Sequence, residues 1–420
     1  MVLCWRLDGA GAFFLALTVV MFVLTAVYTL SYAREDAEKK RFYLFLGLTM
    51  GALVGLCLAG NLVTFYMCFE LLSLLSFPLV LHTGTAAARR ASMTYLGFSV
   101  FGASMALFGM LLLGGGATAR FTAGGFAMEE SGRTRAAYLL LAVGFCCKAG
   151  VLPLSNWLPT AHPEAPAPAS ALLSGVITKA GLLGLLRVTF FAFGADAVRG
   201  TFLQTVMVAL ALSTVFVGSM LAYKEKVLKK RLAFSSVSQL AYGILGLMTL
   251  SQAGVCGALL QVLFHSAAKV GLFLCTGTLA HDAGVTRVDA VRSVARRLPV
   301  TMGCFAAFSL SLVGIPPFGG FAAKWYLGTG AYAGLPAPYG AVAVIVLLVS
   351  ALLTAGYLFP IVGDAFFVKP EAFPASGHAD AYMLVPLVCL ALVVLLVGAM
   401  PAGFVRLFTA LGAEMLGGAV

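Results

Sequence analysis

Apolar segments of membrane-spanning length recur along the whole chain, and they restrict its fold more than any other feature. A transmembrane helix needs about 20 consecutive apolar residues. With 61% hydrophobic and 10% charged residues, the chain has too little polar surface for a soluble fold. The sequence therefore predicts an all-α polytopic membrane protein with about twelve transmembrane helices, at approximately 10–33, 42–61, 62–82, 92–115, 136–158, 169–194, 202–223, 233–250, 255–280, 299–329, 339–363 and 382–403.

The basic residues lie mainly in short loops between these segments, and they predict how the helices are oriented. The net charge of +11 could suggest a nucleic-acid-binding protein, but an excess of charge in alternate loops is the pattern of membrane topology. The richer loops include Lys39–Arg41, Lys224–Arg231 and Lys369, whereas the poorer ones include Arg120 and Arg187. Because cytoplasmic loops carry the excess of Lys and Arg, we expect the richer side in the cytoplasm and both termini outside.

The sequence contains no recognisable motif for a cofactor, a metal or a nucleotide. None of the nine cysteines forms a CxxC pair, so no disulfide framework, haem or iron–sulfur site is expected. His162 and Glu164, expected in a loop, are too few for a metal site. The first apolar run, Gly9–Ala33, is long enough to span a membrane, which argues against a cleavable signal peptide. We therefore expect no cofactor and no bound nucleic acid.

The stretch from Phe145 to Lys179 combines features that are unfavourable inside a membrane. Lys148 lies in an apolar helix, Pro153 interrupts this helix, and Lys179 lies in the next apolar segment. A lysine at the centre of a membrane helix costs about 2.5–3.5 kcal/mol, and a proline leaves a backbone carbonyl without its partner. The alternative is that both lysines extend to the membrane surface. Since each lies more than a helical turn from a loop, we interpret the stretch as part of a hydrated, ionisable path.

Glu70 is the one acidic residue that falls clearly inside a predicted segment. A lone carboxylate there could be protonated and hydrogen-bonded between helices, which is the structural alternative. Burial disfavours the charged form of both a carboxylate and a lysine, whereas a close pair restores the charge of both. A Glu70–Lys148 pair that forms and separates would therefore change the proton affinity of the lysine and act as a proton gate.

Three further titratable residues lie in the later segments. His265 and Lys269 are four residues apart and share one helix face, which favours a proton relay; the alternative is a histidine that links helices by a hydrogen bond. Lys324 follows the interruption at Pro316-Pro317, and its alternative is a position at the membrane surface. The candidate proton-transfer residues are therefore Glu70, Lys148, Lys179, His265, Lys269 and Lys324.

The two interrupted segments predict an internal repeat. Lys148 precedes the break at Pro153, whereas Lys324 follows the break at Pro316. Two broken helices read in opposite senses are typical of inverted repeats with sites near the middle of the membrane. The predicted divisions are an N-terminal transmembrane helix and cytoplasmic loop at 1–41, a first five-helix repeat at 42–197, a second at 198–364, and a C-terminal transmembrane helix and tail at 365–420.

With these residues in view, the chain resembles the antiporter-like, proton-translocating membrane subunits shared by respiratory complex I (NADH:quinone oxidoreductase), Mrp-type Na+/H+ antiporters and membrane-bound hydrogenases. The resemblance covers about Asp8 to Asp364. It rests on five stretches in the family's order: FELLSLLSFPLVL, KAGVLPLSNWLPTAHPEAPAPASALL, LKKRLAFSSVSQLAYGILGL, FHSAAKVGLFL and SLVGIPPFGGFAAKW.

The resemblance implies a role for each candidate residue. By this resemblance, Glu70 is the gating glutamate and Lys148 its partner. Lys179 is the connecting lysine, His265 and Lys269 form the central relay, and Lys324 is the terminal lysine. Together they would form a hydrophilic axis through the membrane, which protons reach by half-channels. Two positions depart from the family pattern, because Thr160 and Val227 stand where acidic residues are usual.

The resemblance also implies the class of function. We expect a proton-translocating subunit of a multisubunit complex in a prokaryotic plasma membrane, with other membrane subunits as partners. Lys324 and the sequence stretches SFPLVLH and FAAKWYL look closest to D-type Mrp subunits of cation/proton antiporters. The alternatives are the proton-pumping subunit of a hydrogenase or quinone reductase, and an independent secondary transporter. No redox or hydrolytic site is predicted, so an enzymatic role would depend on partners, and transport of Na+ is left open.

Overall fold

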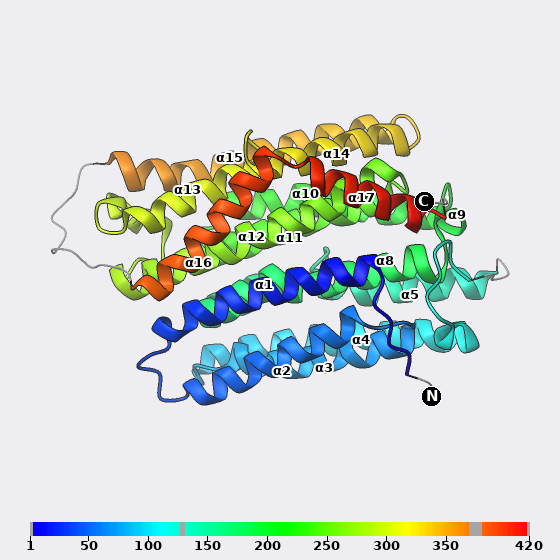
Figure 1. Ribbon diagram of the computed structural model, residues 1–420, viewed down its shortest axis with the longest axis horizontal. Coiled ribbons are helices and arrows are strands. Elements are labelled where there is room, and N and C mark those ends of the chain that lie inside the picture. Colours follow the sequence, from blue (N-terminus) through cyan, green and yellow to red (C-terminus); the bar gives the residue numbers. More distant parts are fainter. Residues whose placement is uncertain (1–2, 127–130, 369–379, 418–420) are drawn as a thin grey trace.

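The computed structural model describes residues 3–126, 131–368 and 380–417. Within these ranges the chain consists of helices and loops, with two isolated β-bridges, Trp5–Ala59 and Val227–Arg287. Most helices run along the long axis of the molecule, and both termini lie at the same end (Figure 1). The prediction of an all-α polytopic membrane fold is therefore confirmed. Lys369, which we placed in a cytoplasmic loop, lies outside the described residues.

Each predicted segment contains a helix, and several segments contain more than one. The first six comprise α1 (Gly9–Tyr32), α2 (Lys39–Cys57), α3 (Leu62–Leu81), α4 (Ala86–Leu113), α5 (Gly132–Ala149) with α6 (Trp157–Glu164), and α7 (Ala167–Leu172) with η2 (Leu173–Ile177), α8 (Lys179–Leu186) and η3 (Arg187–Ala192). The other six comprise α10 (Phe202–Lys224), α11 (Leu228–Met248), α12 (Gln252–Ala283), α13 (Pro299–Val313) with α14 (Gly319–Gly334), α15 (Tyr339–Phe367), and α16 (Ala381–Leu392) with η6 (Val393–Val397). Short helices lie in loops at η1 (Gly114–Thr118), α9 (Ala195–Val198), η4 (Val288–Ala290) and η5 (Val294–Arg296), and α17 (Ala402–Met415) follows η6.

Polar side chains set the start of several apolar helices. Asn61, Thr85 and Ser251 each accept a hydrogen bond from the backbone N–H three residues later, at 2.8, 3.0 and 3.1 Å. These bonds satisfy N–H groups that have no partner within the helix. The apolar sequence therefore gives the helices their membrane-spanning length, and a single polar residue before each of these three helices determines where the helix begins.

Two spans are broken where the prolines predict it. Helix α5 ends at Gly150 with φ +74°, and α13 ends at Gly314 with φ +91°. Both angles lie in the left-handed region, which glycine adopts without strain. The chain resumes as α6 and α14 after a few residues, so each span consists of two half-helices. The inverted relation between the two halves of the chain stays a prediction.

A third span is also broken, which the sequence did not lead us to expect. We predicted a last helix at 382–403 followed by a tail, but α16 and η6 end at Val397, and α17 continues after a bend of 77°. In Figure 1, α16 runs from one end of the bundle to its middle and α17 runs on toward the other end. Pro401 contributes to this break, because proline has no backbone N–H to donate to a preceding carbonyl. A Cβ on Gly398 would lie 2.1 Å from the backbone nitrogen of Gly319, so this break packs backbone to backbone against the break between α13 and α14.

Arg187 is buried, which corrects its predicted place in an outer loop. It lies in η3 with no exposed surface, and its guanidinium makes two hydrogen bonds to the carboxylate of Asp8. The same guanidinium lies over the rings of Phe121 and Phe191, at 5.2 and 5.0 Å from their centroids. Asp8 also caps α1 by accepting from the backbone of Gly11. The pair therefore fixes the first helix against the span that carries Lys179.

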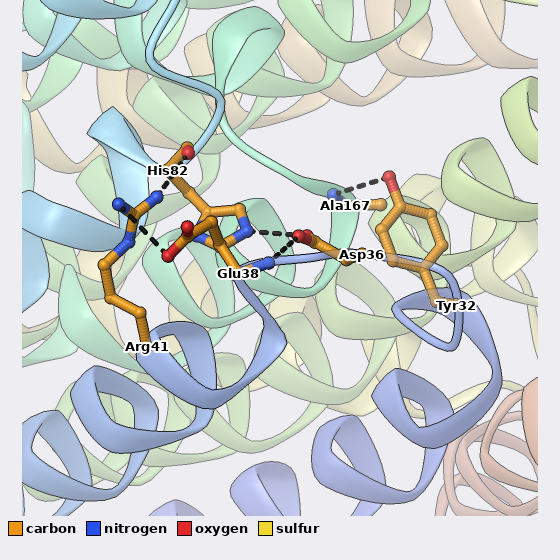
Figure 2. A network of polar contacts seen from close by, with 6 residues as sticks. All are labelled: Tyr32, Asp36, Glu38, Arg41, His82 and Ala167. Carbon is orange, nitrogen blue, oxygen red and sulfur yellow. Dashed lines mark hydrogen bonds and ion pairs between the residues drawn. The ribbon is translucent and has the colours of Figure 1, made fainter.

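A second polar cluster connects helices at the other end of α1 (Figure 2). The Nε2 atom of His82 lies 2.6 Å from a carboxylate oxygen of Asp36, and Arg41 donates to the carbonyl of His82 at 2.9 Å. The backbone N–H of Ala167 donates to the hydroxyl of Tyr32 at 3.4 Å. Burial raises the pKa of Asp36, but the hydrogen bonds from His82 and from the backbone N–H of Glu38, together with the nearby charge of Arg41, outweigh this effect, so the pKa lies below its usual value. The cluster ties the loop after α1 to the end of α3, and the last residue of α1 to the start of α7.

We expect Asp8→Asn to destabilise the protein by about 3 kcal/mol, because it leaves the buried Arg187 without a compensating charge. Thermal unfolding in detergent would measure the change. The matched control is Asp196→Asn, which removes the partner of Arg199 in an exposed pair and should leave the unfolding temperature nearly unchanged. Equal effects of the two substitutions would contradict a structural role for the buried pair.

Candidate functional site

Lys148 lies in the last turn of α5, directly before the break, and is 2% exposed. Its ammonium donates to the hydroxyls of Tyr95, Ser73 and Ser99 at 2.7, 3.0 and 3.3 Å. An ammonium has three donors, and all three are satisfied. Since the acceptors belong to α3 and α4, the first half of the chain forms a polar site for this lysine in the interior of the bundle.

Glu70 lies on α3, three residues before Ser73, and is half-buried. Its carboxylate accepts a hydrogen bond of 3.0 Å from the hydroxyl of Tyr66. Among the described residues no ion pair joins Glu70 to Lys148. Lys148 therefore contacts α3 within one turn of Glu70. In the structure the two charged groups form no ion pair, and Lys148 binds hydroxyl groups.

Lys179 and His265 are in direct contact in the interior. The ammonium of Lys179 lies 2.9 Å from Nδ1 of His265 and donates to the carbonyl of Ser174 at 2.5 Å. Ser174 belongs to η2, a π-helical turn, and such turns are frequent at functional sites because they alter the backbone pairing. A charged lysine can only donate, so His265 accepts through Nδ1; a neutral lysine could accept from Nδ1–H. The contact can therefore hold one transferable proton on either partner.

Lys269 lies one turn after His265 on α12, as the spacing predicts, and has no exposed surface. Its ammonium donates to the carbonyl of Leu232 at 3.0 Å. The hydroxyl of Ser236 donates to that same carbonyl and lies 2.6 Å from the hydroxyl of Ser174. Polar atoms of α11 and η2 thus connect the surroundings of Lys269 with those of Lys179.

Lys324 lies beside the second break. Its ammonium donates to the carbonyls of Leu312 and Val313 at 2.7 and 2.6 Å. These carbonyls belong to the last turn of α13, where no helical N–H is available, and a cation there also suits the helix dipole. The ammonium lies 5.4 Å from the ring centroid of Tyr242 on α11. The lysine therefore completes the end of a broken helix.

The structure adds a buried amide pair that the sequence did not single out. The side chain of Gln261 donates to the side-chain oxygen of Gln239 at 2.8 Å. Gln261 lies one turn before His265 on α12, and Gln239 lies one turn before Tyr242 on α11. The pair thus occupies the region between the central residues and Lys324. In the sequence, Gln239 and Gln261 are amides within predicted membrane segments, and this was the signal that could have identified them.

His162 also differs from the sequence expectation. We expected it in a loop, but it lies on α6, has no exposed surface, and stacks on Phe273 of α12 with centroids 4.6 Å apart. Neither ring nitrogen has a hydrogen-bond partner. Its neighbour Glu164 ends the same helix. Within the described residues no group of three or more His, Cys, Asp or Glu side chains could hold a metal ion.

The fold is that of a polytopic membrane protein with four lysines and a histidine in its helical bundle, and Lys179, His265 and Lys269 share one buried polar cluster. These features are those expected of an antiporter-like membrane subunit. The chain belongs to the family described as NADH:quinone oxidoreductase/Mrp antiporter, TM, whose model matches residues 59–354. The resemblance inferred from the sequence motifs is therefore confirmed.

Two relatives show the range of this family. The chain is 33% identical to NADH-quinone oxidoreductase subunit N of Desulforudis audaxviator, over 91% of this chain and 79% of the relative. It is 31% identical to hydrogenase-4 component B of Escherichia coli, over 76% of this chain but only 50% of the relative.

Solved structures with the same fold come from several complexes. A chain of the Mrp complex from a Dietzia species superposes with a TM-score of 0.86 at 23% identity, over 98% of this chain and 84% of the other. A chain of respiratory complex I from Thermus thermophilus superposes with a TM-score of 0.85 at 25% identity, over 99% and 86%. These likenesses place the fold among the membrane subunits of both complexes.

We expect Lys179 and His265 to be energetically coupled. In a double-mutant cycle with Lys179→Met and His265→Leu, the coupling should be about 1 kcal/mol or more, since each residue is the other's partner. Unfolding in detergent would measure it. The control cycle combines His265→Leu with Lys148→Met, for which the structure shows other partners, and should be additive within about 0.5 kcal/mol. Additivity in the first cycle would contradict the contact.

Proposed function

We propose that this chain moves protons through a prokaryotic plasma membrane as one subunit of a multisubunit complex. The relay would run from Glu70 and Lys148, through Lys179, His265 and Lys269, to Lys324. The observation that best supports it is the contact of Lys179 with His265, which joins titratable groups from the two halves of the chain at 2.9 Å. A buried lysine and a buried histidine in contact can exchange a proton, whereas a purely apolar contact would serve packing equally well.

Glu70 and Lys148 would control access to this relay. While Lys148 binds hydroxyls, as it does here, only neutral dipoles stabilise its charge. Movement of the Glu70 carboxylate toward the ammonium would stabilise that charge and hold the proton. Separation of the pair would lower the proton affinity of the lysine and favour transfer toward Lys179. The pair would thus act as a gate whose closed and open forms differ in the charge next to Lys148.

The partners that drive this movement would belong to a redox complex. Two relatives are named as subunits of a NADH-quinone oxidoreductase and of a hydrogenase, and the fold occurs in respiratory complex I. In such a complex another subunit would carry out the electron transfer, and this chain would carry the protons. Purification of the chain with its native partners tests this proposal, because iron–sulfur or hydrogenase subunits should accompany it.

A D-type subunit of an Mrp cation/proton antiporter is the second candidate. It is favoured by the amino-acid sequence around Lys324 and by the fold shared with a chain of the Mrp complex. In that case the accompanying proteins would be small membrane subunits without redox centres, and proton movement would depend on Na+. The same purification distinguishes the two candidates.

We expect Glu70→Gln to lower proton transport by about 100-fold, because the amide has a similar shape but cannot compensate the charge of Lys148. Membrane vesicles containing the complex and a pH-sensitive dye would report the rate. Insertion should be unchanged, because among the described residues Glu70 accepts a hydrogen bond from Tyr66 alone, and an amide oxygen can accept the same bond. Normal transport by this variant would end the gating proposal.

Lys148→Ala should lower transport by about 100-fold as well, because it removes the group that holds the proton. The matched control is Lys224→Ala, which removes an exposed lysine at the end of α10 and should leave the rate unchanged. The same vesicle assay applies to both. A comparable loss in the two variants would mean that charge reduction in general, rather than the buried lysine, causes the effect.

A further inference from the structure

A buried histidine at the predicted cytoplasmic end of the bundle has no part in the proposed relay. His82 directly follows α3, keeps a helical backbone and is 8% exposed. Its Nε2 atom lies 2.6 Å from a carboxylate oxygen of Asp36 in the loop after α1 (Figure 2). Histidine is the side chain whose charge normally changes between about pH 5 and 8. The pair therefore joins two elements of the fold by a contact whose strength depends on pH.

The charged groups next to His82 come from the loop after α1 and from α2. Among the described residues, His82 forms an ion pair with Asp36 alone. On α2, Arg41 donates to the backbone carbonyl of His82 at 2.9 Å, and its guanidinium lies 3.5 Å from the carboxylate of Glu38. The ring of Phe42 lies 5.0 Å from the imidazole, between centroids. The imidazole is thus held between a carboxylate and an aromatic ring.

The other elements that pack on α3 supply no second partner. Neither η1 nor α7 contains a titratable residue. Those of α4 and α6 are Arg89 and Arg90, both exposed, and His162 and Glu164. Within the part of the chain that the structure describes, none of these four forms an ion pair with His82 or Asp36. The hydroxyl of Tyr32, on the far side of Asp36 in Figure 2, accepts from the backbone of Ala167.

Protonation of His82 changes the strength of its contact with Asp36. A neutral imidazole can donate through Nε2–H to the carboxylate, whereas an imidazolium adds the attraction between opposite charges. The bond from Arg41 to the carbonyl of His82 does not depend on the charge of the ring. The end of α3 therefore stays attached when His82 is neutral, but it is held less firmly.

Helix α3 carries both residues that could face Lys148. Ser73 accepts from the ammonium at 3.0 Å, and Glu70 lies three residues earlier on the same helix. At 3.6 residues per turn, positions three residues apart differ by about 60° around the helix axis. A rotation of this order, together with the greater length of the glutamate side chain, would bring the carboxylate toward the lysine.

The end of α3 influences such a rotation. Because α3 is helical from Leu62 to Leu81, a rotation of its middle also turns His82. Pro78 removes one backbone hydrogen bond and permits a bend, but the chain is helical on both sides of it and still transmits rotation. A firmly held His82 therefore resists the movement of Glu70 toward Lys148, and a loosely held one permits it.

We propose that the His82–Asp36 pair is a pH-dependent lock that positions α3. The proposal rests on the proposed function, because the movement that the lock controls is that of the Glu70 gate. While His82 is protonated, the ion pair keeps α3 in the orientation described here, with Lys148 bound to hydroxyl groups. When His82 loses its proton, the hold weakens and Glu70 can approach Lys148. His82 is thus a positioning residue, which carries none of the transported protons.

The transport rate should therefore depend on the pH at the side of the basic loops. In vesicles containing the full complex, the rate should rise about fivefold or more between about pH 6 and 8 on that side. His82→Gln, which cannot become charged, should transport at low pH as the native chain does at high pH. His82→Lys, which stays charged, should transport at high pH as the native chain does at low pH. Because all proteins are compared under the same gradient, the driving force cancels.

The matched control is His281→Gln. His281 lies 2.6 Å from the carboxylate of Asp282, the next residue of the same helix, so this second pair ties no two helices together. The pH profile of His281→Gln should be that of the native chain.

Hydrogen exchange of the backbone measures the lock without transport. At one fixed value of about pH 6, His82→Gln and Asp36→Asn should raise exchange at the end of α3 and in the loop at 33–38 by a similar factor, about fivefold. An asparagine can still accept from the backbone N–H of Glu38, as Asp36 does, so the turn itself should remain. Native exchange and a native pH profile in the variants of both residues would overturn the lock, and a loss of transport in Glu70→Gln would then still support the relay. Raised exchange together with normal transport by Glu70→Gln would support the lock and contradict the gate alone.

Discussion

The architecture of this protein depends on backbone carbonyls that a membrane cannot hydrate. In the lipid interior every backbone polar group needs a partner within the protein, yet α13 ends in the middle of the bundle and η2 departs from regular helical pairing. Lys324 donates to the carbonyls of Leu312 and Val313, and Lys179 donates to that of Ser174. At these two irregular positions a buried lysine supplies the missing donor, and the free carbonyls supply the acceptors that the lysine needs. The two unfavourable features stabilise each other.

This mutual requirement has a chemical consequence. An ammonium that binds neutral carbonyls and hydroxyls is held less firmly in its charged form than one that binds a carboxylate. Lys148, Lys179, Lys269 and Lys324 all have neutral acceptors in this structure. Their protons are therefore not fixed by permanent ion pairs. By contrast, Arg187 is bound by Asp8, and this tight pair suits a structural role rather than transfer.

Sequence patterns predicted the spans, the two proline breaks and the family, because each rests on a local property: apolar length, missing N–H donors or a motif. They also located the lysines, since a charge in an apolar run is conspicuous. They did not predict that Lys179 meets His265, because the contact joins residues 86 positions apart. The burial of Arg187 and His162 was missed for a similar reason. Their partners lie on distant helices, and a position near a predicted loop says little about burial.

The contact between the last two breaks has a consequence for sequence variation. Gly398 and Gly319 share a volume too small for one methyl group, because a Cβ on Gly398 would lie 2.1 Å from the nitrogen of Gly319, and a Cβ on Gly319 would lie 2.0 Å from the ring of Phe264. Neither glycine can therefore gain a side chain unless its neighbour moves or becomes smaller. A side chain at position 398 would require the final helix to take a different course, whereas one at position 319 would require a smaller residue in place of Phe264.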